Sequence, residues 1–190
     1  MARISFLSRI GRLRFGMGIF PGAVFPLVVF MAALTGCATG KGVTPETYME
    51  IDTISAFAGI LREQPDGVLA NRNGGKIRTQ IITFQFIEDN KVYFCTNAQK
   101  PLYAQLQRNP YVSYCTNAAE FEPVLSINGV VVFVDDKDLK LRALQGSANV
   151  RRFYQTVDNP DFKLFYIDID EIETFGSEGV RLYKIGSGKN

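Results

Sequence analysis

The amino-acid sequence predicts a mainly β domain with flanking helices, in which six mostly antiparallel strands close into a small barrel. Aromatic and β-branched residues gather in six strand-like segments between residues 67 and 176. Few helical segments separate these strands, which favours hairpins over the crossover helices of a parallel sheet. The composition, 46% hydrophobic and 21% charged, is that of an ordinary globular domain. Closure into a barrel would leave no exposed strand edges.

The first 36 residues have the pattern of an export signal. Four arginines and no acidic residue accompany an apolar run from Phe15 to Leu34, and a small-residue site follows. That site, Leu34-Thr35-Gly36-Cys37, resembles the lipobox of bacterial lipoproteins, in which the bond before the cysteine is cut and the cysteine carries the lipid. We therefore expect a signal peptide over 1–36, lipidation at Cys37 and a tether over 37–43, which would anchor the protein to a membrane of the cell envelope. An uncleaved signal anchor is the alternative, because about twenty apolar residues can span a bilayer.

Residues 44–190 are expected to form the folded domain, which begins with a helix. Thr44-Pro45-Glu46 supplies a capping hydroxyl, a proline at the first helical position and an early acidic residue. Pro65-Asp66-Gly67 then ends the helix with turn residues. The apolar residues at helical spacing between these two points are Ile51, Ile54, Phe57, Ala58 and Leu61.

Strands and tight turns follow this first helix. Asn73-Gly74-Gly75 separates the first two strands and 88–91 separates the next two, so each pair is expected to form an antiparallel hairpin. Gly129 lies inside the long fifth strand, where it is expected to mark a bend or a bulge. The expected strands cover residues 67–72, 76–88, 92–97, 111–117, 123–136 and 162–176. Three further helices are expected. One begins at Pro101 and ends before Pro110, and the other two cover 137–145 and 148–157.

Charge and composition exclude several classes of function. Without the four leader arginines, 17 of the 21 basic residues remain against 19 acidic residues, so the mature domain is near −2 and nucleic acid is not an expected partner. The absence of histidine removes histidine dyads, general bases, metal ligands and a haem-binding histidine. Cys95 and Cys115 lie twenty residues apart in apolar strands, a spacing that does not indicate a metal site. They are expected to be buried thiols, and the exported location also permits a disulfide.

The segment after the third strand has the features of an anion site. Thr96, Asn97 and Lys100 precede Pro101, which starts a helix whose unpaired N–H groups and dipole favour negative charge. If the second and third strands pair through their short turn, Arg78 lies near the same end of the hairpin. A hydroxyl, an ammonium group, a guanidinium group and a helix terminus would suit a phosphate. A solvated helix cap is the alternative.

The order of these features resembles the pyridoxamine 5′-phosphate oxidase-like superfamily of flavin-binding split β-barrels. The shared parts are an arginine in the second strand, a strand that ends in threonine, a lysine before a helix that stops at Asn-Pro, and a long strand with glycine ahead of acidic residues. The resemblance covers roughly residues 44–176 and implies FMN bound at a homodimer interface. It implies that Arg78, Lys100 and Thr96 hold the FMN phosphate. The full set of residues that it assigns to FMN is Arg78, Thr79, Gln80, Ile81, Thr96, Asn97, Gln99 and Lys100.

The resemblance implies a membrane-tethered flavoprotein that acts as an oxidoreductase on a small-molecule substrate. It assigns no catalytic residue, because the flavin supplies the electron chemistry and the protein supplies position and electrostatics. The tail, GVRLYKIGSGKN, lacks the Arg-x-His motif of true pyridoxamine phosphate oxidases, so oxidation of vitamin B6 is not expected. A non-enzymatic lipoprotein that binds another phosphate-bearing or planar ligand in the same cleft is the first alternative, and a purely structural lipoprotein is the second.

Overall fold

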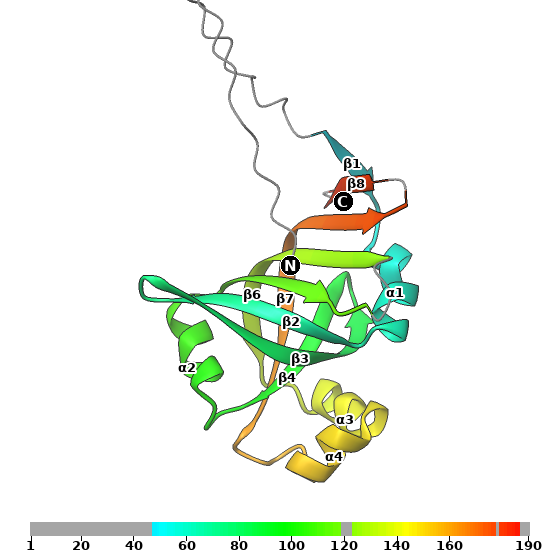
Figure 1. The fold of residues 1–190 in the computed structure, drawn as a ribbon. Coiled ribbons are helices and arrows are strands. Elements are labelled where there is room, and N and C mark those ends of the chain that lie inside the picture. Colours follow the sequence, from blue (N-terminus) through cyan, green and yellow to red (C-terminus); the bar gives the residue numbers. More distant parts are fainter. Residues whose placement is uncertain (1–46, 119–122, 178, 187–190) are drawn as a thin grey trace, which may run out of the picture. The chain divides into compact units, whose positions relative to one another are not determined.

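The protein folds around one β-sheet that closes on itself. In the computed structural model, the described residues are 47–118, 123–177 and 179–186. Six strands close into an antiparallel barrel in the order β7-β4-β3-β2-β5-β6, with β6 returning to β7, and this confirms the predicted fold class. Figure 1 shows the barrel from the side. The strands are β1 (Tyr48–Ile51), β2 (Asp66–Asn73), β3 (Lys76–Glu88), β4 (Lys91–Asn97), β5 (Tyr111–Thr116), β6 (Val124–Val134), β7 (Phe162–Gly176) and β8 (Gly179–Ile185).

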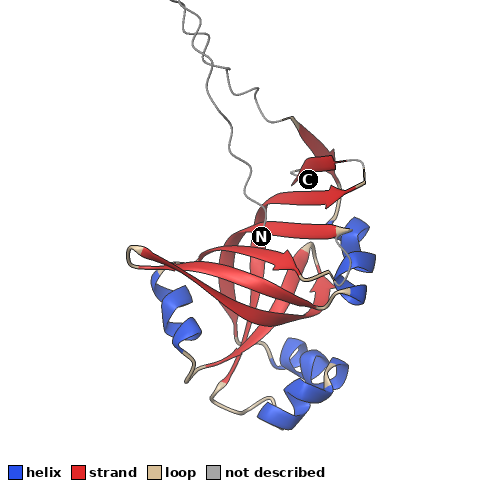
Figure 2. Cartoon of the chain, viewed as in Figure 1, coloured by secondary structure: helices blue, strands red, loops and turns tan. Residues whose placement is uncertain are grey.

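Short helices lie outside the barrel (Figure 2). The described helices are a 3₁₀ turn (Ile54–Phe57), α1 (Ala58–Glu63), α2 (Pro101–Arg108), α3 (Lys137–Gly146) and α4 (Ala148–Tyr154). Thr53 caps the 3₁₀ turn, and Asp136 and Ser147 cap α3 and α4 with their side-chain oxygens. Helix α4 ends at Tyr154 rather than at the expected Val157, because Gln155 has a φ of 64°.

Two tight turns fix the hairpins that the sequence predicted. Gly74, at the β2–β3 turn, has a φ of 62°. Asp89 and Asn90 both have positive φ at the β3–β4 turn, which suits a two-residue hairpin because its backbone twist matches that of the strands. The β2–β3 ladder extends from Asp66 opposite Thr83 to Asn73 opposite Lys76.

The N-terminal part of the domain differs from the prediction. Thr44 lies outside the described residues, and residues 48–51 form strand β1 rather than the first turns of a helix. Strand β1 pairs in parallel with β8, a second strand that the sequence analysis did not predict. The predicted helix is correct only from Ile54 onward, because residues 48–51 are hydrogen-bonded to β8 as a strand. The predicted signal peptide (1–36), Cys37 and tether (37–43) also lie outside the described residues.

The pairing of the long strands β6 and β7 is irregular at Gly129, as the sequence predicts. Their register shifts between Asn128 and Gly129, which is a bulge. A Cβ atom built on Gly129 would lie 2.1 Å from the backbone oxygen of Asp168. The two strands approach each other so closely here that only glycine fits.

The apolar residues form two clusters, one inside the barrel and one outside it. The inner cluster includes Phe94, Tyr114 and Phe165, and α2 covers one side of it with Leu102 and Leu106. The outer cluster packs α3 and α4 against the barrel wall; its buried members are Phe86, Tyr93, Ala143, Leu144, Val150, Tyr154, Phe162 and Leu164. Since adjacent residues of a strand point to opposite faces, β4 and β7 contribute to both clusters. Strand β3 does so across the bulge between Phe84, in the inner cluster, and Phe86, in the outer one.

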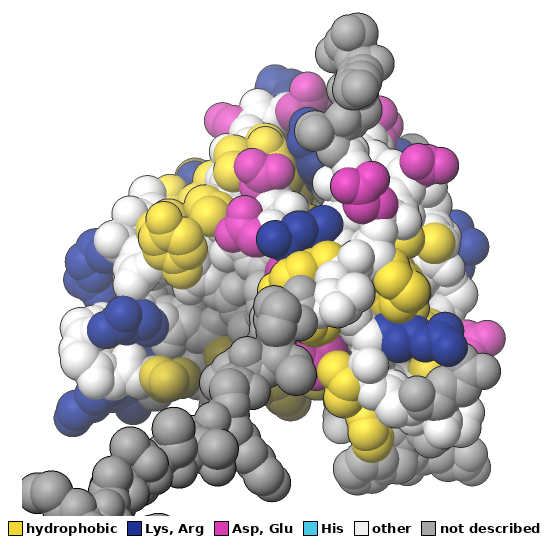
Figure 3. Space-filling view, turned by 90° about the horizontal axis from the view of Figure 1, so that it is seen from above, with side chains coloured by type: hydrophobic (Ala, Val, Ile, Leu, Met, Phe, Trp, Pro, Cys, Tyr) yellow, Lys and Arg dark blue, Asp and Glu magenta, His cyan; other side chains and the backbone are white. Residues whose placement is uncertain are grey.

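No helix among the described residues is long and apolar enough to cross a membrane. In the same part of the chain, no group of acidic and cysteine side chains is placed to hold a metal ion. Cys95 and Cys115 are both free thiols. Acidic, basic and apolar side chains are intermixed on the face seen from above in Figure 3.

The close contact at Gly129 leads to a first prediction. Gly129→Ala places a methyl group against a backbone oxygen that a side-chain rotation cannot move, so we expect the free energy of unfolding to fall by about 2–3 kcal/mol, as for an overpacked core. Chemical denaturation followed by circular dichroism measures this change. The matched control is Gly59→Ala in α1, where a Cβ meets nothing within 4 Å and where alanine favours the helix. Equal stability of the Gly129→Ala variant and the wild type would contradict the contact.

Candidate functional site

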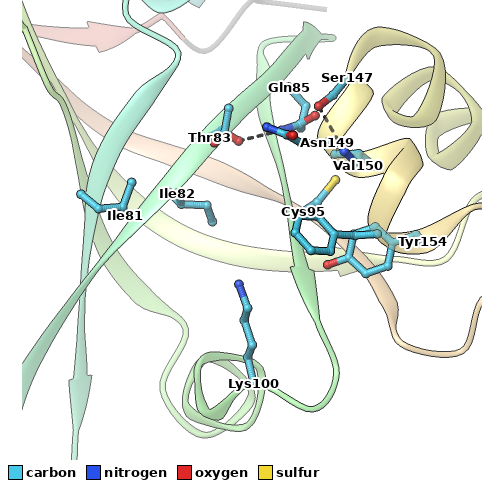
Figure 4. Close-up of a pocket in the computed structure, with 11 residues that line it drawn as sticks. Ile81, Ile82, Thr83, Gln85, Cys95, Lys100, Ser147, Asn149, Val150 and Tyr154 are labelled. Carbon is cyan, nitrogen blue, oxygen red and sulfur yellow. Dashed lines mark hydrogen bonds between the residues drawn. The ribbon is translucent and has the colours of Figure 1, made fainter.

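A pocket of about 200 Å³ lies where β3 and β4 separate. The β3–β4 ladder ends at Phe84 opposite Phe94. Beyond this pair, β4 continues beside β7 alone, with Thr96 opposite Lys163, and β3 continues beside β2 alone. Helix α4 forms the outer wall of the resulting gap (Figure 4). The residues that line the pocket are Ile81, Ile82, Thr83, Gln85, Cys95, Lys100, Ser147, Asn149, Val150, Phe153 and Tyr154.

The turn between β4 and α2 holds Lys100 at the pocket. The Asn97 side chain accepts a hydrogen bond from the Gln99 backbone N–H at 2.7 Å, and the Asn97 carbonyl accepts one from the Lys100 N–H at 3.0 Å. The Gln99 side chain donates to the Asp161 carboxylate at 3.0 Å, which ties the turn to the residue before β7. Lys100 is then the N-cap residue of α2, with Pro101 in the first turn. Figure 4 shows the Lys100 side chain extending from the start of α2 into the pocket.

The Lys100 ammonium group is the pocket's positive charge. Among the described residues it has no ion pair and no hydrogen-bond partner. No aspartate or glutamate lines the pocket, so no carboxylate competes there for this cation. An anionic ligand would therefore meet one unpaired positive charge.

The floor of the pocket is apolar and its thiol is neutral. Ile82 and Val150 contribute aliphatic surface, and Cys95 directs its sulfur toward α4 in Figure 4. Burial raises the pKa of the Cys95 thiol to about 12. Because the thiolate is the nucleophilic form, Cys95 is a packing residue at neutral pH rather than a nucleophile.

The structure brings only some of the predicted residues to this pocket. Ile81 and Lys100 line it, whereas Asn97 and Gln99 stabilise the turn through the bonds described above. Thr96 lies on the opposite face of β4 from Cys95; its side chain is 3% exposed and its hydroxyl has no hydrogen-bond partner. The binding roles assigned to these residues stay predictions.

Arg78, Thr79 and Gln80 lie on the part of β3 that pairs with β2 only. Arg78 stands opposite Asn71 and is exposed, six residues beyond the last β3–β4 pair. That separation is roughly 20 Å along the strand. The expected β3–β4 hairpin forms, but its ladder ends at Phe84 opposite Phe94, so Arg78 has no partner on β4 and its place beside Thr96 stays a prediction.

The α4 wall is the part of the site that sequence reasoning missed. The sequence predicts only a helix for this segment, since it carries no recognisable motif. The one available signal was the spacing of Ser147, Val150 and Tyr154, which places them on one side of a helix. Burial of Val150 and Tyr154 against the barrel leaves Phe153 beside the pocket, 65% exposed.

An apolar surface adjoins the pocket on the outside of β2, β3 and β5. Ile77, Ile81 and Tyr111 are 73%, 67% and 64% exposed. A shallow hollow of about 210 Å³ lies over this surface, lined in part by Ala70, Ile77 and Tyr111. We call Ile77, Ile81 and Tyr111 the exposed apolar face. Ile81 belongs both to this face and to the pocket.

Sequence comparison identifies the family. The family model described as pyridoxamine 5′-phosphate oxidase matches residues 54–176, which is more than half of the chain. The chain belongs to this pyridoxamine 5′-phosphate oxidase family. The match begins at the 3₁₀ turn and ends with β7, so it contains the barrel and every pocket residue. No curated protein matches the chain.

Solved structures share the fold at low sequence identity. A NimC/NimA family protein from Clostridium acetobutylicum is 22% identical, with a TM-score of 0.61 over 67% of this chain and 89% of that one. A pyridoxamine 5′-phosphate oxidase-related, FMN-binding protein from Nostoc punctiforme is 16% identical, with a TM-score of 0.53 over 72% and 92%. A heme-binding protein from Mycobacterium smegmatis is 16% identical, with a TM-score of 0.54 over 65% and 54%. These similarities establish the split-barrel fold.

The residues of the pocket fit a phosphate-bearing ligand such as FMN. A phosphate requires a cation and hydrogen-bond donors, and the pocket offers the unpaired Lys100 ammonium group without an opposing carboxylate. The volume of about 200 Å³ is smaller than the roughly 300–1,000 Å³ of a complete ligand pocket. One chain therefore encloses only part of such a ligand.

The half-buried Cys95 thiol leads to a second prediction. With the pKa raised from 9.0 to about 12, the thiolate fraction near pH 8 falls about 1,000-fold, and alkylation of Cys95 should slow by at least that factor. The rate should rise about tenfold for each unit of pH between 7 and 9. Peptide mass mapping after timed iodoacetamide treatment measures it, with the urea-unfolded chain as the reference. Alkylation of native Cys95 at the unfolded rate at pH 8 would contradict the burial.

Proposed function

We propose that the chain is an FMN-binding flavoprotein, tethered to a membrane through Cys37, that acts as an oxidoreductase on a small-molecule substrate. The observation that carries this proposal is the unpaired Lys100 ammonium group in a carboxylate-free pocket at the split of the barrel. Membership of the pyridoxamine 5′-phosphate oxidase family supports it. When bound, FMN would supply the electron-transfer chemistry of the site.

In this proposal the residues of the chain bind and orient FMN. Lys100 neutralises the phosphate, and the Asn97 and Gln99 hydrogen bonds keep Lys100 in place. Ile81 lies beside the flavin ring. Thr79, Gln80 and Arg78 extend along the same strand and contact FMN where it leaves the pocket, and Thr96 supports the turn from inside the barrel.

We propose that a second copy of the chain completes the site. Three large apolar side chains are exposed on one face, and exposed apolar patches of this kind mark interaction surfaces. A homodimer that covers the exposed apolar face would enclose a ligand resting on Ile81, which the pocket of one chain leaves open.

The tether and the location are proposals from the sequence alone. The lipobox-like site at Cys37 would place the domain outside the cytoplasm, anchored by lipid to a membrane of a bacterial envelope. No nucleic acid is a proposed partner.

A non-enzymatic binding role in the same cleft is the second candidate. Burial raises the pKa of both Cys95 and Tyr154 to about 12, so neither group exchanges a proton readily at neutral pH. No histidine, aspartate or glutamate lines the pocket. A protein that holds a planar or phosphate-bearing ligand without turning it over would have such a pocket.

Removing the positive charge at Lys100 tests the cofactor assignment. Lys100→Met should weaken FMN binding about 10- to 100-fold, because a hydrogen bond to a charged group contributes about 1.5–3 kcal/mol. Isothermal titration calorimetry with FMN measures the loss. The matched control is Lys137→Met, which removes an exposed lysine outside the pocket and should leave the affinity unchanged.

Two results would count against the proposal. Equal FMN affinity of the Lys100→Met variant and the wild type would remove Lys100 from the site. Bound FMN that neither dithionite nor a nicotinamide cofactor reduces would instead favour the non-enzymatic role.

A charge on the exposed apolar face tests the homodimer. Ile77→Asp should convert a dimer to a monomer and lower FMN affinity at least tenfold, because an isolated charge at an apolar interface is costly. Analytical ultracentrifugation gives the mass and calorimetry gives the affinity. The control is Val180→Asp on β8, which changes a 59% exposed apolar residue on another part of the surface. An unchanged sedimentation coefficient for Ile77→Asp would contradict the proposed interface.

A further inference from the structure

The hydroxyl of Tyr154 is a polar group of the pocket that has no role in the proposed function. Tyr154 is only 8% exposed, and its ring packs in the outer apolar cluster. Among the described residues, no side chain or backbone group is hydrogen-bonded to its hydroxyl. Tyr154 lines the pocket, and Figure 4 shows its hydroxyl pointing into the pocket from α4 while Lys100 points in from α2. A hydroxyl that faces a pocket with one cation on the other side is placed to bind a ligand there.

The Tyr154 ring is held rigidly. It stacks on Phe162 with a centroid distance of 4.4 Å and an interplanar angle of 9°. The backbone carbonyl of Tyr154 accepts a hydrogen bond from the Asn159 side chain at 2.9 Å. Arg151 donates to the Leu144 carbonyl at 2.8 Å and so ties α4 to the end of α3. A hydroxyl on such a fixed ring loses little conformational entropy when it binds a ligand.

Burial also fixes the protonation state of this group. It raises the pKa of Tyr154 to about 12, with smaller contributions from Cys95 and Asp161. The group therefore stays a neutral O–H donor between pH 5 and pH 9. A donor of this kind favours an acceptor such as a phosphate oxygen.

We propose that the Tyr154 hydroxyl donates a hydrogen bond to a phosphate group that the Lys100 ammonium group binds from the opposite side of the pocket. The lining supports a phosphate, since Lys100 is its one charged side chain. Tyr154 is thus a ligand-binding residue contributed by α4, and it selects phosphorylated ligands over their unphosphorylated forms. Where the phosphate is that of FMN, this inference rests on the proposed function. A free phosphate ion has the same chemistry and is the other ligand that could supply this phosphate group.

Tyr154→Phe removes the O–H and keeps the ring that stacks on Phe162. In the full-length chain purified in detergent, we expect this variant to bind FMN about tenfold more weakly, which corresponds to about 1.4 kcal/mol. Riboflavin, which lacks the phosphate, should bind the variant and the wild type equally. The ratio of FMN to riboflavin affinity should therefore fall about tenfold. The control is Tyr166→Phe, since Tyr166 does not line the pocket and packs beside Lys91.

Inorganic phosphate separates this inference from the proposed function. If the wild type fails to bind FMN but phosphate raises its melting temperature, and Tyr154→Phe and Lys100→Met each reduce that rise, the phosphate site stands and the flavin assignment fails. Unchanged FMN affinity in Tyr154→Phe, or equal loss of FMN and riboflavin affinity, would overturn the role of Tyr154 at a phosphate. A wild-type chain that binds neither FMN nor phosphate overturns both proposals.

Discussion

The structure depends on the separation of β4 from β3 after the Phe84–Phe94 pair. Up to that point β4 is bonded on both sides; beyond it β4 pairs with β7 alone, and β3 pairs with β2 alone. The separation opens a gap in the barrel wall, but the sheet still closes on itself because β7 also pairs with β6. It creates the gap that Lys100 enters from one side and α4 covers from the other. The pocket is thus a consequence of strand pairing rather than of a special loop.

The chemistry of the pocket follows from what this gap buries. Cys95 and Tyr154 both have raised pKa values, so the pocket contains a neutral thiol and a neutral hydroxyl. Lys100 is then the one charge that a ligand meets. Such a site is suited to holding a phosphate and an apolar ring and lacks a group for general acid–base catalysis near neutral pH. Any redox chemistry in our proposal therefore comes from the bound cofactor, and the protein contributes position and electrostatics.

Local sequence signals predicted most of the fold, and contacts between distant segments account for what they missed. The turn at Gly74 and the bulge at Gly129 were predictable, because each depends on a backbone conformation or a close approach that glycine favours. Strand β1 was not, since Tyr48–Ile51 becomes a strand only through pairing with β8, more than a hundred residues away. Lys100 was found from its place before Pro101. Tyr154 was missed because only the tertiary fold brings α4 to the end of β4.

The most direct test of the account is native mass spectrometry of the wild-type protein after incubation with FMN. In our proposal the pocket binds FMN and a second chain completes the site. The predicted result is a species of two chains with two FMN molecules, and no FMN on the single chain. A single chain that carries FMN, a spectrum with no dimer, or a dimer that carries no FMN would contradict the account.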